Sequence, residues 1–236
     1  MRQRLALIAG TLLLAAAASP AAAIAARPAQ SEHQRIVAHW TAARIAAATP
    51  RDFVRNANGR FKPTARPNPG GGVTGASWTG GGAIVYLSGK VVFDMGGGSW
   101  ICSGSVVNDA DRSGYSMVLT AGHCAVDETT GEFATNWMFI PDFDGSPTYT
   151  CSATVYGCWT SSGLFAHYGF VHAGSFNTQA TTHDWAFAVV GPGGKNNDQL
   201  DVRGSFGINY PAAAVGATVD AFGYPAAGKY HGKDLT

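Results

Sequence analysis

The chain has 236 residues, a net charge of +1 at pH 7, 46% hydrophobic and 13% charged residues, and 31 glycines. The length suits one substantial domain or two small ones, and the near-neutral charge without a basic stripe argues against nucleic acid as a partner. Few charges and many glycines are typical of short strands joined by tight turns.

The first 26 residues have the pattern of a secretory signal peptide. Two arginines precede an apolar run over residues 5–18, which only Gly10 and Thr11 interrupt, and small residues follow up to position 26. The run is shorter than the about 20 residues that span a bilayer, and cleavage after Ala23 or Ala26 satisfies the small-residue rule. We therefore expect a secreted, extracellular protein with no membrane attachment after cleavage, and not an anchored one.

Residues 27–82 are predicted to form a helix and then a linker. Ser31 and Gln34 have the spacing of a capping box, the apolar residues at 36, 37, 40 and 47 give a moderate helical stripe, and Pro50 ends it. Residues 51–72 are rich in Arg, Asn, Pro and Gly, which is typical of a linker. The segment is propeptide-like, and a propeptide would assist folding or restrain activity. An ordinary N-terminal extension is the alternative.

From residue 83 onward, short β-rich segments alternate with turn clusters such as Gly96-Gly97-Gly98. Many short strands with glycine turns, and no helical period of useful length, predict an all-β sandwich or barrel. The expected strands are Ala83–Leu87, Lys90–Met95, Trp100–Val107, Ser116–Thr120, Trp137–Ile140, Ala153–Trp159, Asp184–Val190 and Thr218–Gly223.

Four cysteines lie in the exported part, where an oxidising compartment favours disulfides. Four cysteines allow three pairings. Cys151 and Cys158 enclose six residues and would pair locally, which leaves Cys102 with Cys124. A zinc site is the competing interpretation, but no close CxxC or HxxxH pattern supports it, so neither a metal nor another cofactor is expected.

Two segments carry residues suited to acid–base chemistry. His123 directly follows an apolar strand and precedes Cys124, so a disulfide there would hold the imidazole in one orientation. An imidazole titrates at about pH 6.5 and can accept and return a proton near neutrality. Asp184 opens another apolar strand, where a carboxylate could accept the imidazole N–H. Taken singly, each is more often structural, a satisfied histidine and a strand-capping aspartate.

Taken together, these segments resemble those of a known family. Thr120-Ala-Gly-His-Cys124 resembles the histidine motif of chymotrypsin-like serine peptidases, Cys102-Ser-Gly-Ser105 its partner cysteine segment, and His183-Asp-Trp-Ala-Phe187 its aspartate segment, in the family's order. The bacterial secreted, glutamyl-endopeptidase-like branch is most similar. The resemblance covers residues 83–236.

The resemblance implies a double Greek-key β-barrel that hydrolyses peptide bonds by acyl transfer. His123 would be the general base and then the general acid, and Asp184 would orient it. The implied partner is a protein or peptide substrate, and a monomer is expected.

The sequence departs from the family at the nucleophile. The family's serine lies in a Gly-Asp-Ser-Gly-Gly-like segment after the aspartate, and none follows Asp184 here. Ser205 lacks the flanking glycines of such a segment, and Ser161 and Ser162 precede the aspartate. We therefore expect a C-terminally truncated fragment with an incomplete second barrel and no peptidase activity of its own, its nucleophile lying beyond Thr236. A non-catalytic, protease-like binding module is the alternative.

The remaining polar residues have structural interpretations. Three histidines are expected at the surface or at strand ends, and three loop aspartates give only weak support for a calcium site. The histidines are His167, His172 and His183, and the aspartates are Asp127, Asp142 and Asp144.

Overall fold

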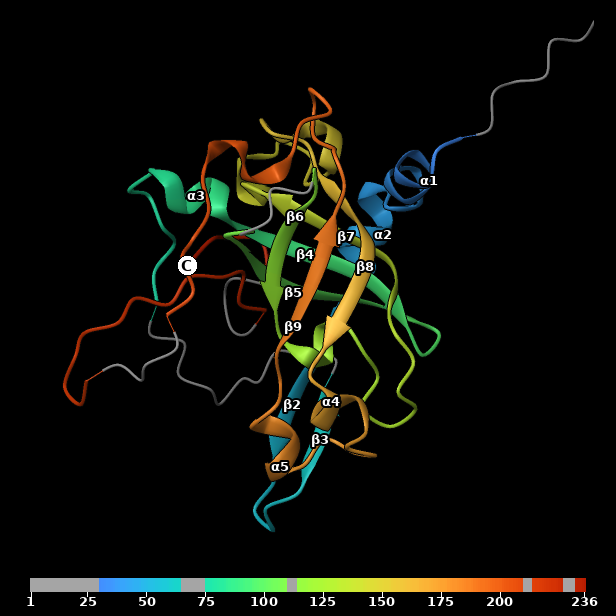
Figure 1. The fold of residues 1–236 in the computed structure, drawn as a ribbon, viewed down its shortest axis with the longest axis vertical. Coiled ribbons are helices and arrows are strands. Elements are labelled where there is room, and N and C mark those ends of the chain that lie inside the picture. The colour runs from blue at the N-terminus through green and yellow to red at the C-terminus, as the bar shows by residue number, and fades with distance from the viewer. Residues whose placement is uncertain (1–29, 65–74, 110–113, 210–213, 227–231) are drawn as a thin grey trace, which may run out of the picture. The chain divides into compact units, whose positions relative to one another are not determined.

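Six antiparallel strands close into a barrel (Figure 1). The pairing order is β5-β4-β7-β8-β9-β6, and β6 pairs back onto β5 over residues 105–107. This barrel confirms the predicted all-β fold. Its strands are β4 (Ser88–Met95), β5 (Gly98–Val107), β6 (Ser116–Thr120), β7 (Thr135–Pro141), β8 (Trp159–Ala166) and β9 (Ala186–Val190).

This computed structural model describes residues 30–64, 75–109, 114–209, 214–226 and 232–236. Residues 31–236 form one compact unit. The predicted signal peptide lies outside the described residues. Within the described ranges, no helix is long and apolar enough to cross a membrane.

The barrel strands are held by alternating apolar side chains. In β4, Val91 and Phe93 point into the barrel and are completely buried, together with Val118 of β6 and Phe139 of β7. Val92, between them, points outward because successive strand residues face opposite sides. It is also completely buried, so the outer face of β4 must be covered by another part of the chain.

The N-terminal helices provide that cover. Helix α1 (Glu32–His39) begins at the predicted capping box of Ser31 and Gln34, and α2 (Ala42–Ala47) follows after a break. Ile36, Trp40 and Ile45 are buried against the outer side of β4, β5 and β7. The Trp40 indole also donates a hydrogen bond of 2.6 Å to the carbonyl of Asn136. The helices are therefore built into the hydrophobic core of the barrel unit.

After the helices, the chain forms a two-residue strand that pairs with β5 and then a hairpin where a linker was expected. Strand β1 (Thr49–Pro50) pairs in parallel with Trp100 and Ile101 of β5. Strands β2 (Asp52–Arg55) and β3 (Phe61–Thr64) then pair antiparallel. The expectation of a linker was wrong here because the Asn and Gly residues form a tight turn, in which Gly59 has φ +82°.

Three other predicted strands differ in the structure. Residues 83–87 form a short helix, α3 (Ala83–Leu87), since a five-residue apolar run fits either element. Residues 151–158 form a turn that the disulfide closes, and strand β8 begins only at Trp159. Residues 218–223 form no strand. Val219 in this segment is 71% exposed, so its side chain is not packed against a sheet.

The described residues after β9 add no strand to the barrel. They contain a 3-10 turn (Leu200–Arg203) and an isolated parallel bridge between Phe206 and Val107 of β5. Among the described residues after Val190, none forms a strand longer than such a bridge.

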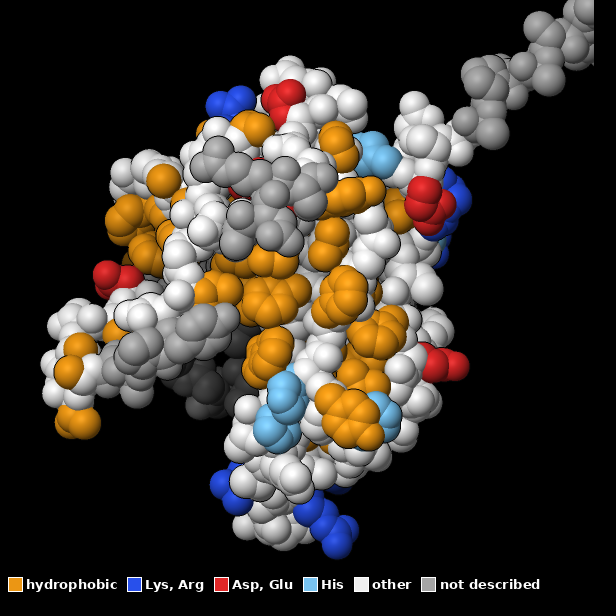
Figure 2. Space-filling model, viewed as in Figure 1, with side chains coloured by type: hydrophobic (Ala, Val, Ile, Leu, Met, Phe, Trp, Pro, Cys, Tyr) orange, Lys and Arg blue, Asp and Glu red, His pale blue; other side chains and the backbone are white. Residues whose placement is uncertain are grey.

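The outer face of β6, β9 and β8 is apolar (Figure 2). The cross-strand register places Leu119, Phe187 and Phe165 side by side on this face. Phe165 is 62% exposed, and Trp185 at the start of β9 is 42% exposed. Unlike the outer face of β4, this part of the barrel has no helical cover among the described residues.

Candidate active site

His123 and Asp184 lie together at one end of the barrel because β6 and β9 pair. The last residue of β6, Thr120, is opposite the first residue of β9, Ala186. His123 follows in a 3-10 turn (Gly122–Cys124), and Asp184 lies two residues before β9. The short helices α4 (Tyr168–Val171) and α5 (Thr178–Thr181) occupy the connection that brings the chain back to Asp184.

The Asp184 carboxylate makes two hydrogen bonds to the same histidine. Its Oδ2 lies 2.8 Å from Nδ1 of the His123 ring, and its Oδ1 accepts a bond of 2.9 Å from the His123 backbone N–H. The His123 side chain is only 18% exposed and the Asp184 side chain only 17%. With a carboxylate as its partner, Nδ1 carries the proton, which leaves Nε2 as the basic nitrogen.

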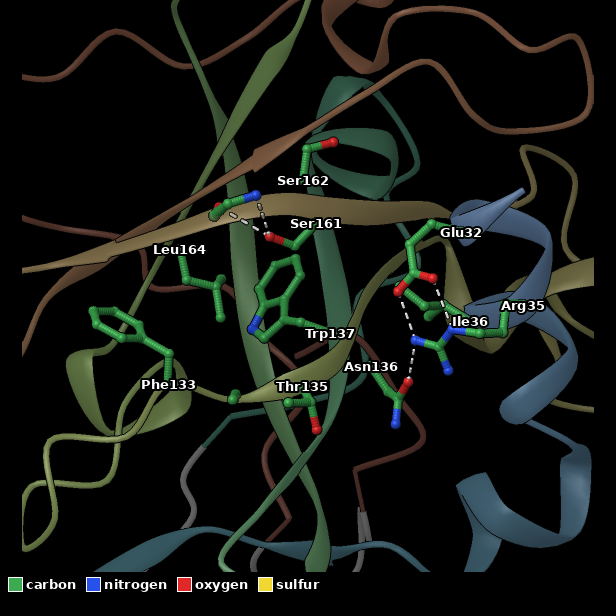
Figure 3. Close-up of a pocket in the computed structure, with 12 residues that line it drawn as sticks. Glu32, Arg35, Ile36, Phe133, Thr135, Asn136, Trp137, Ser161, Ser162 and Leu164 are labelled. Atoms are coloured by element: carbon green, nitrogen blue, oxygen red, sulfur yellow. Dashed lines mark hydrogen bonds and ion pairs between the residues drawn. The ribbon is translucent and has the colours of Figure 1, made fainter. Parts of the chain in front are cut away.

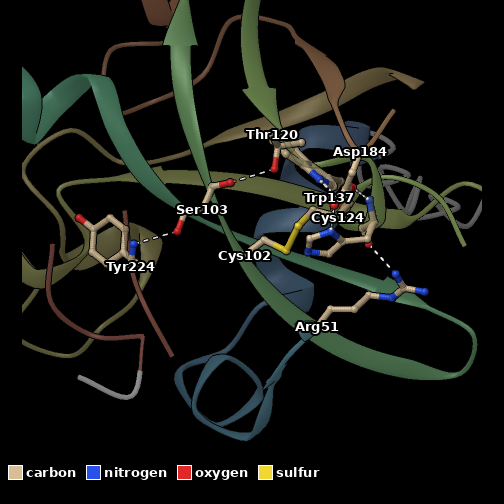
Figure 4. Close-up of a disulfide and its surroundings, with 9 residues drawn as sticks. Arg51, Cys102, Ser103, Thr120, Cys124, Trp137, Asp184 and Tyr224 are labelled. Carbon is tan, nitrogen blue, oxygen red and sulfur yellow. Dashed lines mark hydrogen bonds and ion pairs between the residues drawn. A yellow bond between two sulfur atoms is a disulfide. The ribbon is translucent and has the colours of Figure 1, made fainter. Parts of the chain in front are cut away.

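A disulfide holds the histidine turn against β5 (Figure 4). Cys102 and Cys124 are bonded with Cα atoms 6.2 Å apart, and Cys151 and Cys158 form the second disulfide at 5.3 Å, as expected from the sequence. The His123 ring and the two sulfurs of the first disulfide lie within 4.8 Å of one another. These sulfurs are bonded to each other, so they do not offer thiolate ligands to a metal.

The backbone next to His123 leaves little room for a side chain larger than that of glycine. A Cβ atom on Gly122 would lie 3.0 Å from the Phe170 ring and 3.2 Å from Oδ1 of Asp184. Glycine at this position therefore lets the aspartate approach the His123 backbone N–H, an observation that explains part of the Thr120-Ala-Gly-His motif.

A buried ion pair beside the histidine was missed from the sequence. Arg51, directly after β1, donates a bond of 2.8 Å to the His123 carbonyl and one of 2.9 Å to Oε2 of Glu128. The Arg51 and Glu128 side chains are only 9% and 6% exposed. Figure 4 shows the Arg51 guanidinium directed at this turn. A lone Arg within a polar, Pro- and Gly-rich stretch gives no sequence signal for such a role.

Two aromatic residues at the site were also missed. Phe53 of β2 and Phe176 of the loop between α4 and α5 both lie edge-on to the His123 ring, with centroids 5.6 and 5.9 Å away. The acidic neighbour of Phe53, Asp52, is exposed as a whole residue, but desolvation of its carboxyl group raises its pKa, and the nearby His123 opposes that rise.

The candidate serines occupy other places. Ser161 and Ser162 lie on β8, where the Ser161 hydroxyl bonds the Gly163 carbonyl, and Ser205 lies just before the bridge that Phe206 makes to β5. Among the described residues, no serine hydroxyl is hydrogen-bonded to the His123 ring.

The other singled-out histidines stack on neighbouring rings, although His183 directly precedes Asp184 in the sequence. His183 stacks on His167 with ring centroids 4.2 Å apart, and His172 stacks on Tyr168. These contacts agree with the expected surface and strand-end positions.

Two of the loop aspartates accept hydrogen bonds from other groups of the chain. Asp144 accepts from the Tyr224 hydroxyl and the Leu235 N–H, and Asp127 accepts from two backbone N–H groups of its own turn. Asp142 begins a 3-10 turn in the left-handed conformation. Within the described ranges, these carboxylates do not form a cluster of metal-ligating groups.

An open cleft of about 400 Å³ lies elsewhere, between α1 and the barrel (Figure 3). Arg35 crosses it, bonded to Glu32 and to the Asn136 side chain. Ser161 and Ser162 line the opposite wall. The cleft contains neither His123 nor Asp184, so its size does not mark it as the reactive site.

Comparisons with known proteins agree with the fold. Residues 83–165 match the family model described as lysyl endopeptidase, C-terminal domain. The matched range includes His123 but not Asp184, so the position of the aspartate rests on the barrel geometry. A search of curated proteins finds no match.

Two solved bacterial serine proteases are similar over the barrel. The thermostable serine protease AL20 from an extremophilic microorganism is 29% identical, with a TM-score of 0.50, over 66% of this chain and 65% of that one. Protease Anisep from Arthrobacter nicotinovorans is 37% identical, with a TM-score of 0.50, over 64% of this chain and 61% of that one. The chain thus spans less than two thirds of each matched structure. It has a chymotrypsin-like protease fold and is related to bacterial serine proteases.

Proposed function

We propose that this chain provides the histidine–aspartate part of a secreted serine endopeptidase that acts on protein or peptide substrates. The observation that carries the proposal is the double hydrogen bond from Asp184 to the ring and the backbone of His123. A structural histidine needs only a satisfied ring nitrogen. Fixing the ring and the backbone together sets the direction of Nε2, as a general base requires.

The proposed reaction is acyl transfer. A serine Oγ attacks the carbonyl carbon of the scissile bond while Nε2 of His123 removes its proton, and Asp184 stabilises the resulting imidazolium. His123 then returns the proton to the leaving amine, and an acyl-enzyme remains. Water, deprotonated by Nε2, hydrolyses this ester and releases the second product and the serine.

The serine and the oxyanion-hole N–H groups are proposed to come from a segment outside the described residues. No serine among the described residues bonds the His123 ring, and Ser205 belongs to the segment that pairs with β5. Export by the N-terminal signal is proposed with this function, and the two disulfides fit an oxidising compartment.

Casein hydrolysis by the product of the complete coding sequence tests the proposal. His123→Ala and Asp184→Asn should each abolish most activity, the latter by about 10⁴-fold because it leaves the imidazole in the wrong tautomer. His172→Ala is the matched control, since this exposed ring stacks on Tyr168. Hydrolysis that survives His123→Ala would refute the assignment. Residues 1–236 alone should not hydrolyse casein, and if they do, Ser205 is the first nucleophile to replace.

A further inference from the structure

The His123 ring is covered by residues that are distant in the sequence. Phe53 lies edge-on to it, and the Phe53 and Phe176 rings stack face to face with centroids 3.8 Å apart and planes 5° apart. Since Asp184 occupies Nδ1, a reacting hydroxyl must approach through Nε2. Aromatic rings packed against the imidazole compete with a substrate for the space around it.

Both strands of the β2–β3 hairpin contribute to this cover. Phe61 of β3 packs edge-on to Phe176 with centroids 5.3 Å apart, so Phe176 contacts both hairpin strands as well as the His123 ring. The Arg51 guanidinium lies 5.4 Å from the centre of the Phe53 ring. Figure 1 shows the hairpin beside α4 and α5, at the end of the barrel where β6 ends and β9 begins.

Arg51 anchors the hairpin at its entry. Its backbone N–H continues the β1 pairing by bonding the Ile101 carbonyl at 3.4 Å, and its guanidinium joins the His123 carbonyl to Glu128. The carbonyl bond ties the hairpin to the residue that it covers. This bond places Phe53, two residues later, over the ring.

The hairpin is held much less firmly than the helices before it. Helices α1 and α2 bury Ile36, Trp40 and Ile45 in the core. In contrast, Phe53 and Phe61 are only partly buried, and no described side chain of the hairpin is fully buried. A segment with few buried apolar contacts opens at a lower free energy than the core does. The hairpin can therefore leave the site while the helices stay in place.

We infer that the β2–β3 hairpin, entered through Arg51, is an in-chain inhibitor of the His123–Asp184 site, and that activation requires displacing this hairpin but not α1 and α2. The inference rests on the proposed endopeptidase function and adds its regulation. It differs from a propeptide that is lost as a whole, since loss of α1 and α2 would expose Val92 and Ile101 of the barrel.

The first test measures access to the histidine and needs no catalysis. The full chain and its Phe53→Ala variant are treated with diethyl pyrocarbonate, and the labelling rate of each histidine is followed by peptide mass spectrometry. We expect His123 to be labelled at least about threefold faster in the variant, because removal of the ring uncovers the imidazole. Val54→Ala, on the opposite face of the same strand, is the control, and exposed His172 is the internal reference. Equal His123 rates in both variants would overturn the inference.

A second variant and a second readout separate this inference from the proposed function. Phe61→Ala removes the contact of β3 with Phe176, which loosens the hairpin. This variant should therefore also accelerate the labelling of His123. In the complete gene product, Phe53→Ala should increase His123-dependent casein hydrolysis. Hydrolysis that depends on His123 but does not respond to Phe53→Ala would refute inhibition and leave the function standing. Fast labelling without hydrolysis in any variant would refute the function, while the steric cover would stand.

Discussion

The Arg51–Glu128 pair allows a quantitative test of how firmly the N-terminal segment is tied to the barrel. Arg51→Met leaves the Glu128 carboxylate buried, with its side chain 6% exposed and without its guanidinium partner. Removing one partner of a buried ion pair costs about 3–5 kcal/mol, because an uncompensated charge remains. We expect a loss in the lower half of that range, since Glu128 lies in a loop that can relax toward water.

Glu128→Gln should cost less, about 1–2 kcal/mol, the cost of weakening one charge-assisted hydrogen bond. Arg51 would keep the His123 carbonyl at 2.8 Å and the Asp127 carboxylate at 3.5 Å. In Arg51→Met/Glu128→Gln no unpaired charge remains at position 128, and only the more exposed Asp127 carboxylate loses its partner. The double variant should therefore be more stable than the sum of the single losses predicts, by about 1–2 kcal/mol.

Urea unfolding of the full chain, followed by tryptophan fluorescence, measures these free energies. The matched control is Arg35→Met, which breaks a pair with Glu32 whose side chains are 47% and 66% exposed. An exposed pair contributes less than about 1 kcal/mol. The reasoning is refuted if Arg51→Met costs no more than Arg35→Met, or if the single Arg51 and Glu128 losses simply add.

Two further predictions concern the barrel. Replacing Cys102 and Cys124 by Ala, which opens a disulfide with a sequence separation of 22, should lower the free energy of unfolding by about 3 kcal/mol through loop entropy; a urea midpoint equal to that of the unsubstituted chain would contradict this. Burial, with a smaller contribution from Lys233, lowers the pKa of Lys90 to about 7 from 10.5. The unfolded chain therefore binds the extra proton between these values, and stability rises with pH across that window. The Lys90→Met variant should lack this rise. It should be more stable than the unsubstituted chain by on the order of 2 kcal/mol at about pH 6, and by less at about pH 9.5. Urea midpoints of the two proteins that differ by the same amount at both pH values would refute this prediction.

The barrel and the dyad were the predictable parts of this molecule. Strand β6 was predicted at Ser116–Thr120, its observed bounds, because its short apolar run ends at the histidine motif. The approach of Asp184 to His123 was expected from the resemblance, and the β6–β9 register provides the physical reason. The resemblance of the two segments carried this expectation, because each residue taken singly, at a strand end, is more often structural.

The parts that the sequence did not reveal depend on long-range contacts. The β2–β3 hairpin was predicted to be a linker because residues 51–72 are rich in Arg, Asn, Pro and Gly. Its Phe53 and Phe61 pack on Phe176, which is more than 100 residues away in the sequence. Arg51 is recognisable as a partner of His123 only once β1 has paired with β5. The α3 segment was predicted as a strand for a different reason. A run of five apolar residues is too short to show the periodicity that distinguishes a helix from a strand.

The pairing of β6 with β9 also sets the order in which the site can assemble. His123 and Asp184 are 61 residues apart, so the histidine can meet the aspartate only after the start of β9 has left the ribosome and a long loop has closed. The hairpin is synthesised before either residue. In a chain that emerges from the N-terminus, Phe53 is therefore available to meet the imidazole before the aspartate is. A polypeptide made in this order has the Phe53 side chain within reach when the His123–Asp184 hydrogen bond first forms.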